Sequence, residues 1–265
     1  MRTACALAMV LAAIAGSAAA QGRGPDALYL TAHIDSESSV SGAGTEVEWL
    51  HSLSERSSLL LGGATASAES LWWGYGTVGG LMKGRRLIVM ARASLGPAEF
   101  LGERSSFVRI IATATVPIGS GFYADIEGQH ASVLHAPANT FKLGGSYVTR
   151  RLSMRLAYIA TVPSHAARLH SVSGRSDVTV GRLTLFGGTT MTAVEQSNGS
   201  VPLELLTGSR PTQDIFAGAS FAAGQSRVIG TVEIVPRSTG RFARTTTTIQ
   251  LPVGRQSGRS APLAQ

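Results

Sequence analysis

Apolar and polar residues alternate in short segments along most of the chain. In 106–116, Val108 and Ile110 fall on one side of an extended chain and Arg109 on the other. A two-residue period is typical of strands with one apolar and one polar face. It predicts strands at 27–34, 45–53, 58–66, 71–82, 86–95, 106–116, 122–130, 140–149, 152–161, 170–180, 183–193, 214–223, 227–235 and 241–253.

The connections between these segments differ in length. Tight turns are predicted at 54–57, 83–85, 117–121, 150–151, 181–182 and 224–225, whereas 35–44, 96–104 and 194–213 read as longer loops. An even number of strands, with short turns at one end and long loops at the other, is typical of bacterial outer-membrane barrels, whose termini lie in the periplasm. The pattern predicts an all-β fold, a single antiparallel up-and-down transmembrane β-barrel of about 14 strands. Twelve strands are the alternative, because 66–71 is a very short loop and 165–180 is weakly patterned.

Both ends of the chain lie outside the patterned region, and we expect the barrel to cover 21–254. Residues 1–20 combine Arg2, a short apolar run and the ending Ala18-Ala19-Ala20, the pattern of a secretory signal peptide cleaved after Ala20. The apolar run is shorter than the roughly 20 residues of a membrane-spanning helix. Residues 255–265 form a polar tail. Cys5 is the only cysteine, so the mature chain is expected to contain neither a disulfide nor a reactive thiol.

The formal charge of +7 could indicate a nucleic-acid partner. The basic residues are scattered singly, however, and an exported protein rarely meets nucleic acid, so we expect no such partner. Positive charge on an exported, half-apolar chain fits better with the anionic surface of a bacterial envelope or with an anion pathway.

The charges of the predicted strands fall on the face opposite the branched aliphatic residues. Because an Arg or Lys facing lipid at mid-depth costs about 2 to 4 kcal/mol, this face is expected to point into the barrel. The charges either line a water-filled, mildly anion-favouring pore or neutralise one another in a sealed barrel. A barrel of this width leaves space unless loops fill it. The predicted pore-lining residues are Glu46, Glu48, Arg86, Arg92, Arg109, Asp125, Glu127, Lys142, Arg155, Arg175, Asp177, Arg227, Glu233 and Arg244.

Large aromatic residues mark the predicted membrane interfaces, where amphipathic rings are favoured. We assign this position to Trp49, Trp72, Trp73 and Tyr158. Tyr75 is also expected to be an interface anchor with Trp72 and Trp73; the alternative for these three residues is a sugar-stacking platform.

Catalytic and metal-binding patterns are weak in this sequence. No pair of its 6 histidines has a ligand spacing with carboxylates nearby, and no Lys-Ser/Thr follows the glycine-rich run 74–80. Ser164-His165 and His170-Ser171 could serve a hydrolase acting on outer-membrane lipids, but such dipeptides are common by chance. We expect no catalytic residues, no metal and no cofactor.

The alternation over 27–253 resembles that of Gram-negative outer-membrane β-barrel proteins, and in length and strand rhythm the chain is most similar to the small YaiO-type barrels. This resemblance implies a channel, porin or export pore of the outer membrane. Its implied partners are outer-membrane lipid, lipopolysaccharide and the barrel-assembly machinery. The alternative is a non-transporting envelope barrel, either sealed or soluble in the periplasm. The chain departs from the class in its polar C-terminus, where an aromatic residue is usual, its few aromatic residues and its basic charge.

Overall fold

The computed structural model describes residues 26–37, 40–68, 71–133, 136–164, 167–194, 212–237 and 240–253. The predicted signal peptide and the polar tail lie outside these ranges. The strands are β1 (Asp26–Glu37), β2 (Val40–Ser52), β3 (Ser57–Ala68), β4 (Leu71–Lys83), β5 (Ile88–Phe100), β6 (Glu103–Gly119), β7 (Phe122–Val133), β8 (Ala136–Val148), β9 (Leu152–Pro163), β10 (Leu169–Val180), β11 (Leu183–Val194), β12 (Thr212–Ala223), β13 (Ser226–Arg237) and β14 (Gly240–Val253).

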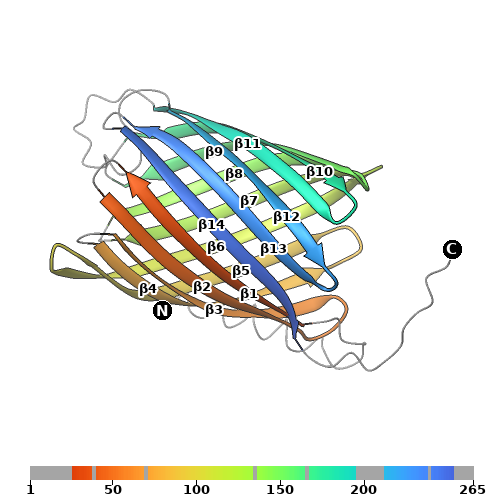
Figure 1. Cartoon of the computed structure of the whole chain (residues 1–265), viewed down its shortest axis with the longest axis horizontal. Helices are drawn as coiled ribbons and strands as arrows, with labels where there is room; N and C mark the ends of the chain where they lie inside the picture. Colours follow the sequence, from red (N-terminus) through yellow and green to blue (C-terminus); the bar gives the residue numbers. More distant parts are fainter. Residues whose placement is uncertain are drawn as a thin grey trace.

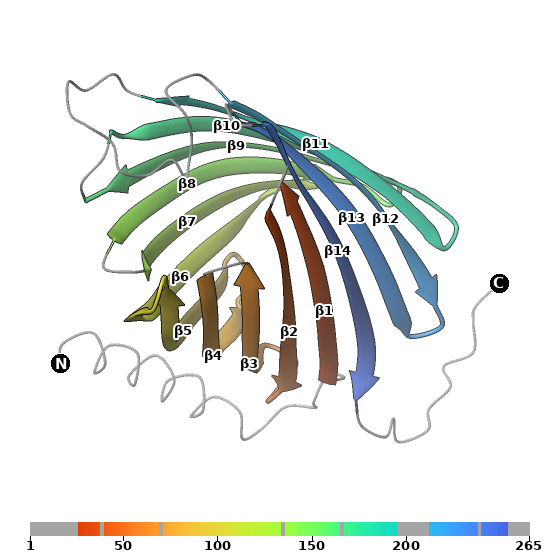
Figure 2. The same ribbon diagram turned by 60° about the vertical axis from the view of Figure 1, so that its left-hand side comes forward.

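Each strand pairs with the strand that follows it in the sequence, so the sheet has up-and-down topology (Figure 1). The sheet closes on itself because β1 pairs with β14 in antiparallel register, from Asp26 opposite Val253 to Glu37 opposite Phe242. The second view shows the strands curving around a common axis (Figure 2). The predicted all-β barrel is confirmed, and the count is fourteen strands and not twelve.

The strands are longer than the alternation predicted. The expected loops 35–44 and 96–104 are mostly strand, because β1 and β2 are separated only by 38–39, and β5 and β6 only by Leu101 and Gly102. Serine and glycine led to the wrong prediction, since here they allow close approach within the sheet. A Cβ on Gly96 would lie 1.9 Å from the carbonyl oxygen of Gly74. Glycine in a strand can mark such an approach and not only a loop.

The turns predicted to be tight lie at one end of the barrel, on the right in Figure 1. The expected contrast with long loops at the other end is wrong for most connections, because several of them, such as 38–39 and 101–102, are equally short. The predicted turns at 181–182 and 224–225 are confirmed, and Gly181 and Gly224 have φ of 61° and 64°. Among the described hairpins of this end, Ser120 is the one residue other than glycine that has a positive φ. We refer to this end, which also holds the first residue of β1 and the last of β14, as the turn end.

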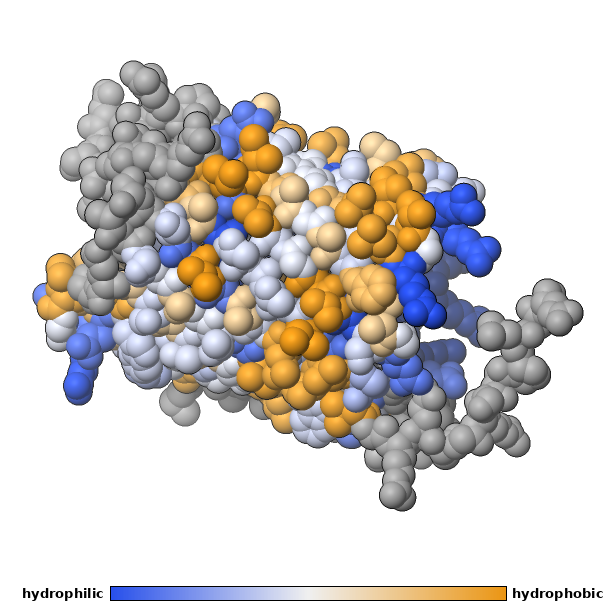
Figure 3. Space-filling model, viewed as in Figure 1, coloured by the Kyte–Doolittle hydropathy of each residue, from blue (hydrophilic) through white to orange (hydrophobic). Residues whose placement is uncertain are grey.

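The outer wall of the barrel is apolar. On β13, Val228, Val232 and Ile234 are exposed at alternate positions, and the other strands repeat this arrangement. Figure 3 shows the apolar side chains over the flank of the barrel and hydrophilic residues at the turn end. Exposed aliphatic side chains on this scale are costly in water and match the acyl region of a bilayer.

In the described part of the chain, no helix is long and apolar enough to cross a membrane.

Candidate functional site: the barrel lumen

The lumenal face carries almost all the charges predicted to line it. Paired residues of neighbouring strands point to the same side of the sheet. The strand register therefore shows whether a residue shares the face of its paired residues, lumenal or outer. Arg175, for example, belongs to the row of paired residues that includes Glu233 and Arg244. Arg86 is the exception: β5 begins at Ile88, and Arg86 lies exposed in the turn 84–87. It belongs to the rim of the barrel and not to its wall, because the strand ends before reaching it.

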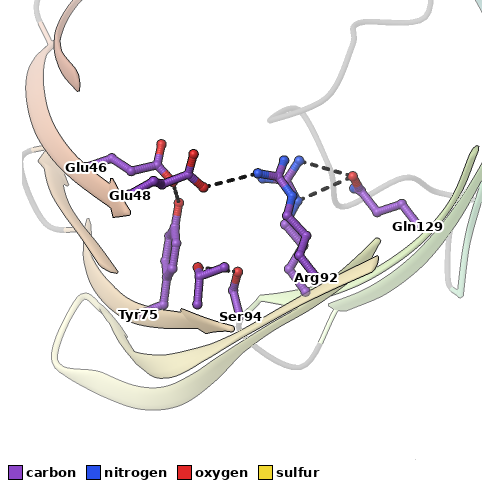
Figure 4. Close-up of polar contacts among 8 residues, drawn as sticks. Glu46, Glu48, Tyr75, Arg92, Ser94 and Gln129 are labelled. Carbon is purple, nitrogen blue, oxygen red and sulfur yellow. Dashed lines mark hydrogen bonds and ion pairs between the residues drawn. The ribbon is translucent and has the colours of Figure 1, made fainter. Parts of the chain in front are cut away.

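A polar network covers the lumenal side of β2 to β7 (Figure 4). Arg92 Nη1 lies 3.4 Å from Glu48 Oε1, and Arg109 donates to Gln129 Oε1 over 3.2 Å. Two strands, β3 and β4, separate Glu48 on β2 from Arg92 on β5 along the sheet. The ion pair therefore spans the concave side of the wall, and the two side chains occupy lumenal space between the strands.

Apolar packing supports this network from the wall. Tyr75 stacks on Phe107 with 4.6 Å between ring centroids, and its hydroxyl donates to Glu46 over 3.5 Å. Ile111 and Ala98 are buried on the same lumenal face. This side of the lumen is consequently filled by side chains.

The lumenal side of β7 to β10 carries two ion pairs. Arg155 and Arg175 are direct cross-strand partners, an arrangement in which like charges repel. Each has its own carboxylate: Arg155 Nη2 lies 3.3 Å from Asp125 Oδ2, and Arg175 Nε lies 2.8 Å from Asp177 Oδ1. The repulsion is thereby offset within the wall.

The seam that closes the barrel contains a bidentate ion pair. Arg244 of β14 donates to both carboxylate oxygens of Asp35 of β1, over 2.7 and 2.9 Å. The sequence analysis missed Asp35, which it placed in a loop. Only the pairing of the first strand with the last brings these residues together.

Other lumenal side chains have few or no protein partners. Glu127 accepts a hydrogen bond from Thr113 over 3.5 Å. Lys142 and Arg227 make no hydrogen bond or ion pair with the described residues. With Asp35 included and Arg86 removed, acidic and basic side chains on the described wall nearly balance. The excess of basic over acidic residues in the predicted pore-lining set is therefore not found on the described wall.

Water reaches the lumenal charges. The side chains of Arg155, Arg175 and Arg244 are 38%, 45% and 37% exposed, although the sheet surrounds them on all sides. Side chains that water reaches inside a closed sheet require empty space in the lumen. The side lined by β9 to β14 is therefore more open than the side lined by β2 to β7.

The predicted interface aromatics divide between the two faces. Trp49, Trp72 and Tyr158 lie on the outer wall, on the same faces as exposed aliphatic residues. Trp73 is opposite the buried Ala98 on the lumenal face, and Tyr75 also points inward (Figure 4). The prediction was wrong for Trp73 and Tyr75, because neighbouring residues of a strand point to opposite sides and the pair cannot share one interface.

Basic residues dominate the turn end. We call the exposed cations of this end the basic rim; Glu55 is the one acid in the described turns there. The basic rim consists of Arg56, Lys83, Arg85, Arg86, Arg150, Arg151 and Arg182.

The Ser-His dipeptides do not form a catalytic pair in the described residues. His170 contacts the Tyr158 hydroxyl on the outer wall, whereas Ser171 is buried on the lumenal face and hydrogen-bonds Thr192 over 2.8 Å. His165 lies outside the described residues. Within the ranges that the structure covers, no group of three or more His, Cys, Asp or Glu side chains is placed to hold a metal ion.

No protein-family model matches the chain, and no curated protein sequence does so. Solved structures match its fold. A bacterial polysaccharide outer-membrane secretin has a TM-score of 0.62 at 8% identity, covering 87% of this chain and 99% of its own. The CymD monoaromatic hydrocarbon channel has a TM-score of 0.63 at 10% identity, covering 89% and 90%. The NanC porin has a TM-score of 0.57 at 7% identity, covering 85% and 100%.

The resemblance to outer-membrane β-barrel proteins is confirmed at the level of the fold, whereas the Gram-negative origin and the closer similarity to YaiO-type barrels stay predictions. The chain has the fold of the outer-membrane β-barrel proteins, as a closed, up-and-down barrel of fourteen strands.

Proposed function

We propose that this protein is an outer-membrane channel for small hydrophilic solutes, with a preference for anions. The observation that carries the proposal is the exposure of Arg155, Arg175 and Arg244 inside a closed sheet. Charged side chains that meet water within a barrel, behind an apolar outer wall, support an aqueous path across a membrane.

The basic rim supports the preference for anions. Its cations are exposed and nearly unopposed, whereas most lumenal carboxylates are paired, such as Asp35 with Arg244 and Asp125 with Arg155. A charged entrance raises the local concentration of the opposite ion and lowers that of its own sign. We infer that selectivity arises at the turn end more than along the wall.

The location follows from the same proposal. We propose export through the signal peptide 1–20 and insertion into the outer membrane by the barrel-assembly machinery, with lipid and lipopolysaccharide around the apolar wall. The turn end, where both termini emerge from the barrel, faces the periplasm. A soluble periplasmic barrel is disfavoured because its exposed aliphatic wall would face water.

A sealed barrel is the second candidate, and the network on β2 to β7 favours it. Arg92, Glu48 and Tyr75 occupy lumenal space on that side (Figure 4). If the opposite side were also blocked, the charges would have a structural role alone.

Conductance in planar lipid bilayers distinguishes the two candidates. We expect discrete channels with a reversal potential of anion-favouring sign under a tenfold KCl gradient, and loss of most of that preference when Arg85, Arg86, Arg150 and Arg151 are changed to Gln. Arg104→Gln is the matched control, since this exposed cation lies at the opposite end of the barrel. Refolded protein that inserts without conducting would support the sealed barrel.

A further inference from the structure

We propose that a cavity in the lumenal wall of β10 to β13 binds a carboxylate carried on a six-membered ring. The cavity has a volume of about 270 Å³ and is lined by residues of all four strands. Pockets for drug-sized ligands measure about 300 to 1,000 Å³, so this one suits a single ring. Access from bulk solution rests on the proposed channel, whereas binding to the isolated barrel does not.

Arg175 is held in a fixed orientation at this cavity. Its Nε donates to Asp177 Oδ1 over 2.8 Å, and its guanidinium carbon lies 4.5 Å from the centroid of the Phe186 ring. The ring in turn lies against Gly218, where a Cβ would approach it to 2.4 Å. A guanidinium fixed by stacking and by one nitrogen loses little entropy when its remaining nitrogens bind a planar anion. Those two nitrogens have no hydrogen bond to the described residues.

Arg227 provides a second guanidinium at the same cavity. It is exposed on the lumenal face of β13 and makes no hydrogen bond or ion pair with the described residues. Asp177 neutralises Arg175, so the positive charge of Arg227 is the one left without an opposite charge in the lining. The uncompensated charge of Arg227 beside the oriented guanidinium of Arg175 favours a ligand with one negative charge. Because guanidinium groups form paired hydrogen bonds with carboxylates, we expect that charge to be a carboxylate.

The rest of the lining explains the preference for a ring. Phe186 and Ile229 supply apolar surface, and the hydroxyls of Thr184 and Ser220 supply polar contacts. Flat rings with an apolar face stack on such surfaces. The carboxylate would lie between the two arginines and the ring over the apolar part. Both an aromatic acid and a sugar acid share this chemistry.

The cavity lies close to the basic rim. Its residues Thr179 and Thr184 flank the turn 181–182, and Arg227 follows the turn 224–225. An anion drawn to the rim would meet this cavity a short distance inside the lumen. The site therefore lies on the path of solutes that pass the turn end of the lumen.

Isothermal titration calorimetry on the refolded barrel in detergent tests the site. The probes are benzoate and glucuronate, with glucose as the uncharged control. We expect at least one acid to bind and glucose not to bind, and the stronger acid identifies the ring type. Arg227→Gln should weaken binding at least about tenfold, since the substitution removes a charge-assisted hydrogen bond to the carboxylate. Phe186→Leu should also weaken it, most strongly for benzoate.

Lys142→Gln is the comparison within the same lumen, because Lys142 has no ion pair with the residues that the structure covers and does not line the cavity. Wild-type affinity in Lys142→Gln supports the site. Equal weakening in Lys142→Gln and Arg227→Gln would show that the ligand responds only to the general electrostatic field of the lumen, and it would overturn the proposed site. Absence of binding by both acids to folded wild-type protein would also overturn it. Heat-modifiable gel migration shows that each variant is folded. Binding without conductance would contradict the proposed channel and support the binding site. Conductance without binding would support the channel and contradict the binding site.

Discussion

Gly96 and Gly74 bring the backbones of β4 and β5 into close contact where a side chain would not fit. The ideal Cβ position at Gly96 is 1.9 Å from the Gly74 carbonyl oxygen, far inside the contact distance of two such atoms. Glycine is thus required at 96 by space and not by backbone angle. Gly76, two residues from Gly74, has no atom within 4 Å of its Cβ position. Gly96 and Gly76 therefore form a matched pair of a crowded and an open glycine.

Gly96→Ala should lower the free energy of unfolding by about 1 to 3 kcal/mol, since overpacking forces the backbones apart. Gly76→Ala should change it by no more than about 0.5 kcal/mol. Urea unfolding in lipid vesicles, followed by tryptophan fluorescence, measures both. Equal effects of the two substitutions would refute the close approach.

The ion pair at the seam should contribute to closure of the barrel. Arg244 and Asp35 form two short hydrogen bonds, and Asp35 is mostly buried. After allowance for solvent screening of the partly exposed Arg244, a double-mutant cycle with Asp35→Asn and Arg244→Gln should give a coupling energy of about 1 kcal/mol. The exposed pair Arg104 and Glu99 should give less than about 0.5 kcal/mol in the same vesicle assay. A coupling at the seam no larger than at the exposed pair would contradict its role.

At the scale of strands, the two-residue period predicted the number of elements and the face of each. That prediction is robust because a shift of one residue would turn every charge toward lipid. The strand ends were less predictable, since the glycine and serine residues of 35–44 and the glycine residues of 96–104 occur both in loops and in closely paired strands. The partners of lumenal charges were not predictable at all: Asp35 and Arg244 are 209 positions apart, and only closure of the sheet joins them.

Two neighbouring residues of β13 test the assignment of faces. Val232 is exposed on the outer wall and Thr231 faces the lumen, both near the middle of the strand. Val232→Arg should cost about 2 to 4 kcal/mol of folding free energy in a bilayer. Thr231→Arg should cost less than half as much, because the lumen is wet. Urea titration of folding into vesicles provides the values, and a larger cost for Thr231→Arg would reverse the faces.

At the scale of the whole molecule, three features support the proposed channel: an apolar outer wall, a lumen that water enters on the side of β9 to β14, and a cationic turn end. In the proposed channel, the filled side of the lumen would narrow the path, and the basic rim would select the ions that approach it. The filled side could not be predicted from the sequence, because it depends on side chains of several strands meeting across the concave wall. The basic rim was predictable in principle, because most of its residues lie in turns that the alternation already placed at one end.

Cysteine scanning along β13 tests this account most directly, since Cys5 in the predicted signal peptide is the only native cysteine. Single cysteines at 228 to 234 would be exposed to a water-soluble, membrane-impermeant maleimide in outer membranes. We expect labelling at lumenal positions 229, 231 and 233 and protection at 228, 232 and 234. Protection at every position would contradict the open lumen, and labelling at 228, 232 and 234 would contradict the membrane-facing wall.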